Sequence, residues 1–143
     1  MHTQQSQESI ARAIAERAHA GQVDKAGKPY IGHPAHVAIS VEGDKAKAVA
    51  WLHDVVEDTP MTFDDLRAAG IDDEVLAALE LLTHDKTVPY MEYVAAIREN
   101  DLARTVKLAD LAHNSDLSRL PEVTDADLQR VEKYRQAMGL LRG

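Results

Sequence analysis

The sequence predicts an all-α fold, a single compact bundle of seven or eight helices. Three observations favour this class: aromatic residues make up only 4% of the chain, alternating runs of β-branched residues are rare, and alanine recurs at a helical spacing. The 143 residues are 45% hydrophobic and 28% charged, as in a globular protein. We therefore expect one domain over residues 1–143, built around one core.

Helix-capping and helix-breaking residues divide the chain into helices joined by short loops. Pro34 and Asp44 open two of the expected helices, and Gly21 and Gly43 close two others. The segment Thr62-Phe63-Asp64-Asp65 resembles a capping box. The expected helices cover about residues 5–21, 34–43, 44–59, 62–70, 72–82, 89–100, 101–120 and 124–141.

Charge and composition exclude several classes of protein. The chain has 16 Lys and Arg against 24 Asp and Glu, with the two signs interspersed, so a basic face for long nucleic acids is not expected. No apolar run is long enough for a membrane helix, and the N-terminal residues show no secretory signal, so we expect a cytoplasmic protein. There is no cysteine, so any metal must be bound by His, Asp or Glu.

One apolar face of the helix expected from Asp44 ends in an imidazole. The face is formed by positions i, i+3, i+4 and i+7: Ala46, Val49, Ala50 and His53. Asp54 follows directly, and Glu57 and Asp58 lie one turn further on, so four ionisable groups form a continuous patch. Several buried carboxylates with nothing opposing them would repel one another.

The helix expected from Asp101 shows the same feature, since Asp110 lies in the middle of its apolar face and His113 shares that face. A divalent cation between the two helices explains both anomalies, and His33, in a proline-rich loop, is a further candidate ligand. A buried His-Asp ion pair without metal is the alternative. We interpret the other histidines as surface or core residues: His19, His36, His84 and His113.

A ligand set of two histidines and two aspartates suits Mn²⁺, Fe²⁺ or Zn²⁺ in a site that keeps positions open for water. His53 and Asp54 are adjacent and so point about 100° apart around a helix. Both side chains still reach an ion that lies between their two directions.

At this point the sequence resembles the HD-domain phosphohydrolases, and within them the hydrolase domain of the RelA/SpoT alarmone family. The matching segments lie in the family's order within about residues 8–116, followed by a C-terminal packing helix over about 124–142. They are HAGQ at 19–22, GKPYIGHPAHVA at 27–38, AWLHDVVEDT at 50–59 and VKLADLAHN at 106–114. The length leaves no room for a synthetase domain, so the resemblance implies a small, stand-alone alarmone hydrolase.

The resemblance implies a role for each candidate residue. Glu57 and Asp58 would position and activate the attacking water, and the substrate would be contacted by Lys25, Tyr30 and Asn114. The resemblance implies one Mn²⁺ held by His33, His53, Asp54 and Asp110. The implied reaction is hydrolysis of the 3′-pyrophosphate of (p)ppGpp, which releases pyrophosphate and leaves GDP or GTP.

The sequence departs from the family's usual pattern near the expected nucleotide pocket. Asp24 stands where the family has Arg, and Ala26, Lys28 and Leu111 replace a usual Ser, acid and Arg. The partner that the resemblance implies is a small anionic nucleotide. Because the departures bear on the choice of base, an adenosine compound such as (p)ppApp is an alternative to (p)ppGpp. Two rivals are a hydrolase of another phosphorylated nucleotide and a non-catalytic nucleotide-binding module. A homo-oligomer is compatible with the sequence, which does not indicate its size.

Overall fold

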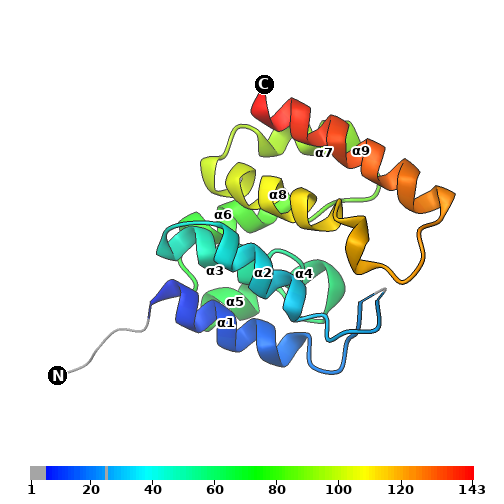
Figure 1. Ribbon diagram of the computed structural model, residues 1–143. Coiled ribbons are helices and arrows are strands. Elements are labelled where there is room, and N and C mark those ends of the chain that lie inside the picture. The colour runs from blue at the N-terminus through cyan, green and yellow to red at the C-terminus, as the bar shows by residue number, and fades with distance from the viewer. Residues whose placement is uncertain (1–5, 25) are drawn as a thin grey trace.

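The computed structural model describes residues 6–24 and 26–143, which form nine α-helices and one 3-10 turn (Figure 1). In these residues β-pairing is limited to an isolated antiparallel bridge between Val23 and Pro29, so the predicted all-α class is confirmed. The helices are α1 (Gln7–Ala18), α2 (Gly32–Ser40), α3 (Asp44–Leu52), α4 (Val55–Asp58), α5 (Phe63–Ala68), α6 (Asp73–Leu82), α7 (Tyr90–Ile97), α8 (Asp101–Asn114) and α9 (Asp125–Arg142), with the 3-10 turn η1 (Leu117–Arg119) before α9.

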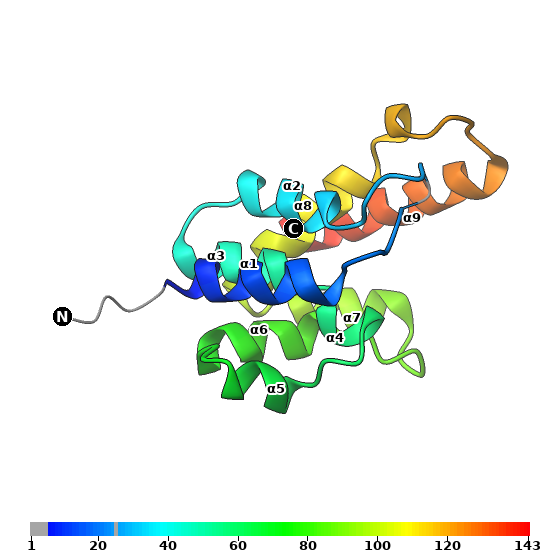
Figure 2. The same ribbon diagram turned by 90° about the horizontal axis from the view of Figure 1, so that it is seen from below.

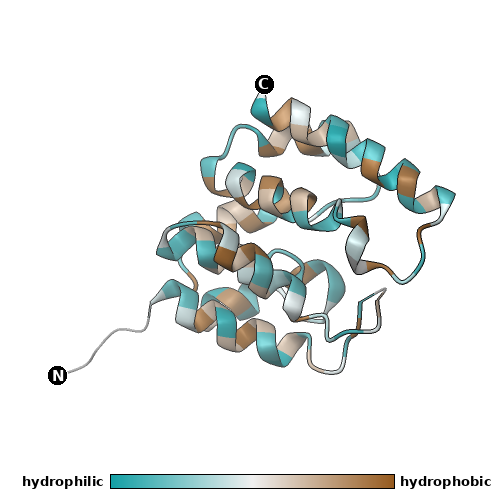
Figure 3. Ribbon diagram, viewed as in Figure 1, coloured by the Kyte–Doolittle hydropathy of each residue, from teal (hydrophilic) through white to brown (hydrophobic). Residues whose placement is uncertain are grey.

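Local sequence signals account for most helix boundaries. The predicted capping box at Thr62 forms, because the Thr62 side chain accepts from the Asp65 amide while the Asp65 carboxylate accepts from the Thr62 amide. Gly43 precedes α3 with φ of 99°, a conformation that favours glycine. The α1 and α9 helices show hydrophobic and hydrophilic residues interspersed along their length (Figure 3), as is typical of helices that cover a core.

Several expected helices are shorter than predicted, and the helix expected to open at Pro34 begins at Gly32 and ends at Ser40. Two of the differences affect the polar residues. The helix expected over 44–59 is interrupted at His53 and Asp54, which adds α4 as a separate turn. The helix expected over 101–120 ends at Asn114, and Asp116 then caps η1 by accepting from the Ser118 amide. Both interruptions place polar side chains at one end of the bundle.

The α3 helix lies at the centre of the packing and contacts α1, α2, α6 and α8. On the other side α9 packs on α7 and α8, and Figures 1 and 2 show α8 running between α2 and α9. The largest buried side chains come from six different helices and belong to one core: Leu52, Leu66, Leu79, Ile97, Leu111 and Leu141. Among the described residues, no helix has both the length and the apolar character needed to cross a membrane.

Candidate active site

The interruption between α3 and α4 turns two adjacent side chains toward one another. Asp54 leaves the regular helical conformation, with φ of −109° and ψ of −2°, while His53 keeps φ of −59° and ψ of −24°. The turn brings His53 Nε2 to 3.1 Å from Asp54 Oδ2. Tyr30 holds Asp54 from the other side, because its hydroxyl donates a hydrogen bond to Asp54 Oδ2.

Residues from α2 and α8 complete this cluster. His33, in the first turn of α2, lies with Nε2 2.8 Å from Oδ1 of Asp110 in α8, and the same oxygen is 3.3 Å from His53 Nε2. The side chains of His33, His53 and Asp110 are only 4–7% exposed. The structure therefore brings together the four residues that the sequence analysis selected as ligands.

The donor set fits a divalent cation. One ligand atom from each of His33, His53 and Asp54 lies within 4.8 Å of the others, and Asp110 Oδ1 contacts both imidazoles. His53 Nδ1 donates to the Ala50 carbonyl at 2.6 Å, which leaves Nε2 as the nitrogen that faces the cluster. Hydrogen bonds from the ring nitrogen that does not face the metal orient the histidine ligands of metal sites. Two imidazole nitrogens and two carboxylates suit Mn²⁺, Fe²⁺ or Zn²⁺.

The carboxylates of the cluster are held in their charged form. Burial would raise the pKa of Asp110, but Lys107, His53 and His33 outweigh it and hold that pKa well below its usual value. For Asp54, burial is outweighed mainly by His53, and the pKa falls to about 2. The pKa of His53 is raised because Asp54 and Asp110 outweigh the opposing effect of its burial. The negative charge needed to bind a cation is thus retained inside the bundle.

Lys107 also belongs to this site, although it was not among the residues predicted from the sequence. Its Nζ lies 3.0 Å from Asp110 Oδ2, and its side chain is 14% exposed. The spacing in the sequence could have indicated this pair, since Lys107 lies three residues before Asp110 on the same helix. Lys107 Nζ also lies over the Tyr93 ring, 5.4 Å from the ring centre, within the range of a cation–π interaction.

The acidic pair of α4 lies one turn beyond the cluster and is exposed. The Asp58 amide donates to the Asp54 carbonyl at 2.9 Å, and Glu57 Oε1 accepts from the His84 amide at 3.3 Å. Partial burial, together with the nearby Asp54 charge, raises the pKa of both carboxyl groups. A carboxylate with a raised pKa is a stronger proton acceptor.

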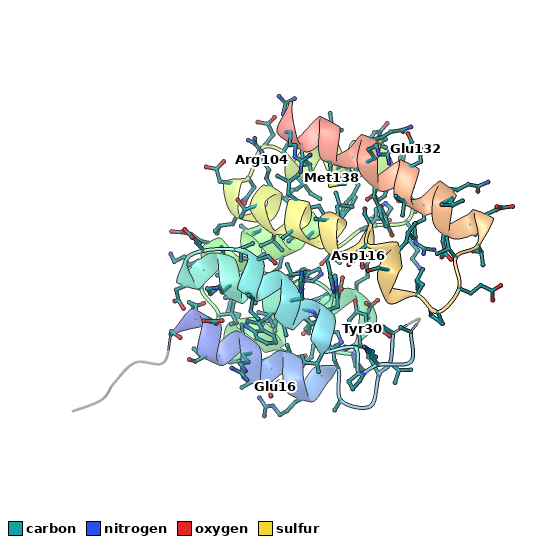
Figure 4. All side chains as sticks on the ribbon, in the orientation of Figure 1. Glu16, Tyr30, Arg104, Asp116, Glu132 and Met138 are labelled. Carbon is teal, nitrogen blue, oxygen red and sulfur yellow. The ribbon has the colours of Figure 1, made fainter. Side chains whose placement is uncertain are left out.

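A pocket of about 300 Å³ lies beside the cluster. Two of its lining residues hydrogen-bond to the cluster: Tyr30 donates to Asp54, and Asn114 Nδ2 donates to Asp110 Oδ1 at 3.0 Å. Figure 4 shows Tyr30 and Asp116, both lining residues, at the same end of the bundle. The full lining is Val23, Asp24, Ala26, Tyr30, Asn114, Asp116, Leu120, Arg130 and Tyr134.

The pocket is also lined by two residues of α9, a helix expected from the sequence to pack on the domain. Arg130 and Tyr134 lie four residues apart and line the pocket. Two other basic residues have partners elsewhere, since Lys133 lies 4.2 Å from the centre of the Tyr90 ring and Arg135 pairs with Glu132. The four-residue spacing of Arg130 and Tyr134 places both on one face of the helix, which the sequence shows. Which face of α9 lines the pocket depends on how the helix docks.

Of the other predicted contacts, Lys25 lies outside the described residues. His113, which we interpreted as a surface or core histidine, contacts the cluster through a 2.7 Å approach between its Nδ1 and that of His33.

The sequence and the fold are both similar to those of known proteins. Proteins named guanosine-3′,5′-bis(diphosphate) 3′-pyrophosphohydrolase MESH1 from Danio rerio and Xenopus tropicalis are each 38% identical to this chain, over 124 and 120 residues. The matches cover 78% and 76% of this chain and 67% and 66% of those proteins. The bifunctional (p)ppGpp synthase/hydrolase SpoT of Escherichia coli is 33% identical over 118 residues, which are 73% of this chain but 17% of that protein.

The fold matches a solved structure over the whole chain. The structure is similar to that of a metazoan orthologue of SpoT, a protein described as hydrolysing ppGpp. The TM-score between the two structures is 0.77 and their sequences are 24% identical; the match covers 100% of this chain and 89% of the orthologue's chain. No protein-family model matches the sequence. The identity and coverage shared with the MESH1 proteins are sufficient to conclude that the chain belongs to the family of guanosine-3′,5′-bis(diphosphate) 3′-pyrophosphohydrolases.

Proposed function

We propose that this chain hydrolyses the 3′-pyrophosphate of (p)ppGpp, releasing pyrophosphate and GDP or GTP, with Mn²⁺ as the cofactor. One observation carries the proposal: two imidazoles and two carboxylates from three segments converge beside a pocket of about 300 Å³, and two residues of that pocket hydrogen-bond to the cluster. The activity named for the MESH1 and SpoT relatives supports the same chemistry.

The ligands of the cation would be His33, His53, Asp54 and Asp110. A bound divalent cation neutralises phosphate oxygens and lowers the pKa of water at the site. Neutralisation of the phosphate charge matters in this chain, because the chain carries a formal charge of −8 and the proposed substrate is an anion. Arg130 lines the pocket while paired with Asp127, and its guanidinium would offer a phosphate group a hydrogen-bonding partner.

The acidic pair would handle the proton of the attacking water. Glu57 and Asp58 are exposed and lie one turn from Asp54, and the raised pKa of each favours proton acceptance. Asn114 and Tyr30 would orient the nucleotide, because both line the pocket while bonded to cluster carboxylates. Lys25 would contribute a further phosphate contact, on the strength of the sequence motif alone.

We also propose a cytoplasmic location and a single hydrolase domain. A nucleotide substrate is consistent with activity in the cytoplasm. The core extends from Ala11 in α1 to Leu141 in α9, which supports a single domain over the described residues.

The test is pyrophosphate release from ppGpp by the purified full chain, with and without Mn²⁺. We expect Mn²⁺-dependent release that falls by more than about 100-fold in Asp54→Ala, because the variant removes a ligand outright. Asp64→Ala is the matched control, since that carboxylate is 92% exposed on α5, and it should behave as wild type. Release that needs no divalent cation, or that survives in Asp54→Ala, would contradict the proposal.

A specific observation keeps (p)ppApp as a second candidate substrate. Asp24 and Ala26 line the pocket at positions where the resembling family has Arg and Ser. Parallel assays with pppApp decide the matter, since equal or faster release from the adenosine compound would reject guanine as the preferred base. Release of orthophosphate alone would instead indicate a different phosphorylated nucleotide.

A further inference from the structure

His113 contacts Nδ1 of His33, the ring nitrogen of this candidate metal ligand that does not face the cluster. The planes of the His33 and His113 rings differ by only 7°, and their centres are 4.9 Å apart. The two Nδ1 atoms are 2.7 Å apart, much closer than the ring centres, so the rings meet through their Nδ1 edges. A nitrogen-nitrogen distance of 2.7 Å between rings whose planes are nearly parallel is that of a hydrogen bond with one hydrogen between the two atoms.

The opposite edge of the His33 ring determines which atom donates. His33 Nε2 faces the cluster and lies 2.8 Å from Asp110 Oδ1, so Nε2 is the atom available to a cation. A neutral imidazole that binds a metal through one nitrogen carries its hydrogen on the other. His33 would then donate from Nδ1, and His113 Nδ1 would be the acceptor, with the His113 hydrogen on Nε2.

We propose that His113 is a positioning residue for the metal ligand His33, whose tautomer and ring orientation it fixes through the Nδ1 to Nδ1 hydrogen bond. The inference rests on the part of the proposed function in which His33 binds a cation, and goes beyond it by assigning a role to His113. The two histidine ligands are thus oriented differently, since His53 donates to the Ala50 carbonyl and His33 donates to another imidazole.

The choice of an imidazole has a physical reason. A carboxylate behind a ligand is common in metal sites, but this cluster already contains Asp54 and Asp110. A neutral acceptor orients His33 without adding a third negative charge close to the buried pair. The His36 ring stacks on the His113 ring, with the two ring centres 3.9 Å apart and the two planes within 16° of each other. This stacking limits rotation of the His113 ring.

The test compares Mn²⁺ affinity in two variants of His113. His113→Phe retains a flat ring for stacking on His36 but loses the acceptor, and we expect its Kd for Mn²⁺ to rise by about 10–100-fold. His113→Asn places an amide oxygen close to the position of Nδ1, so it should restore most of the affinity. His36→Phe is the matched control: it changes the stacked ring alone and should bind Mn²⁺ as wild type does.

Calorimetric titration gives the Kd values, and circular dichroism with thermal unfolding in the absence of cation confirms that each variant is folded. A His113→Phe variant that binds Mn²⁺ as tightly as wild type would overturn the proposal. Equal loss in His113→Phe and His113→Asn would overturn it as well, because a retained acceptor would then have no effect.

A second readout examines the hydrogen directly. With diamagnetic Zn²⁺ as the probe, ¹⁵N NMR of the imidazoles should show hydrogen on Nδ1 of His33 and on Nε2 of His113. A hydrogen on Nδ1 of His113 would reject the assignment. Neither readout uses a nucleotide, so a chain that binds Mn²⁺ through this arrangement but releases no pyrophosphate would disprove the proposed function and leave the role of His113 intact. A wild-type chain that binds neither cation would disprove both.

Discussion

Tyr93 shows at the residue scale how one buried polar group is satisfied between helices. Its hydroxyl donates to the Leu82 carbonyl at the end of α6 at 2.5 Å, and the residue is 8% exposed. Burial raises the pKa of Tyr93 to about 12, although the nearby Lys107 charge opposes the shift. The phenol therefore remains protonated well above the pH at which an exposed tyrosine ionises.

We expect the absorbance at 295 nm of wild type minus that of Tyr93→Phe to titrate near pH 12. An unfolded tyrosine ionises near pH 10, so the folded state holds more protons between about pH 10 and pH 12. Its contribution to the free energy of unfolding is complete below about pH 10 and is lost as the pH rises toward 12. Tyr93→Phe should lose stability less steeply over this interval. A difference spectrum that titrates near pH 10 would contradict the expectation.

At the scale of elements, the start of α9 connects a local capping signal to the pocket. Thr124 Oγ1 accepts from the Asp127 amide at 3.2 Å, and Asp127 Oδ2 accepts from the Thr124 amide at 2.9 Å. Arg130 contacts Asp127 in the next turn and also lines the pocket. The capping box thus fixes where the helix begins and with it the place of Arg130.

Thr124→Ala should lower the free energy of unfolding by about 1 kcal/mol, because the variant removes the side-chain oxygen that caps α9. Urea denaturation measures this change, and Thr124→Ser, which keeps the hydroxyl, should restore most of the stability. If alanine and serine behave alike, the hydroxyl contributes nothing and the capping interpretation is wrong.

At the scale of the whole molecule, the last helix belongs to the same core as the first. Leu141 is fully buried near the C-terminal end of α9, in one cluster with Ala11 and Ile14 of α1. The helix that contributes Arg130 and Tyr134 to the pocket is therefore held by the packing of the whole bundle.

We expect Leu141→Ala to lower the free energy of unfolding by about 2–5 kcal/mol, the usual cost of a cavity left by a buried leucine. Leu128→Ala is the matched control on the same helix, since Leu128 is 53% exposed, and it should change stability by less than about 0.5 kcal/mol. Denaturation followed by circular dichroism should remain a single transition in both variants. A separate early transition in Leu141→Ala would show that α9 unfolds independently of the rest.

Local patterns in the sequence predicted the all-α class, most of the helices and the four candidate metal ligands, but not Lys107 or His113. Caps such as the Thr62 box depend on residues three apart, and the spacing of apolar residues depends on one helix at a time, so both are readable locally. Polar residues on apolar faces, above all His53 and Asp110, indicated the cluster because a buried charge needs a partner.

How these residues meet depends on contacts between distant segments of the chain. His33 and Asp110 are 77 residues apart in the chain, and no local pattern states that their side chains lie 2.8 Å from one another. Asp54, at the interruption, accepts a hydrogen bond from Tyr30, 24 residues earlier in the chain, and the contribution of Arg130 to the pocket depends on how α9 docks. Helix formation is dictated by neighbours in sequence, whereas the site is assembled by packing between segments that are distant in sequence, and for that reason the sequence named its residues without fixing its geometry.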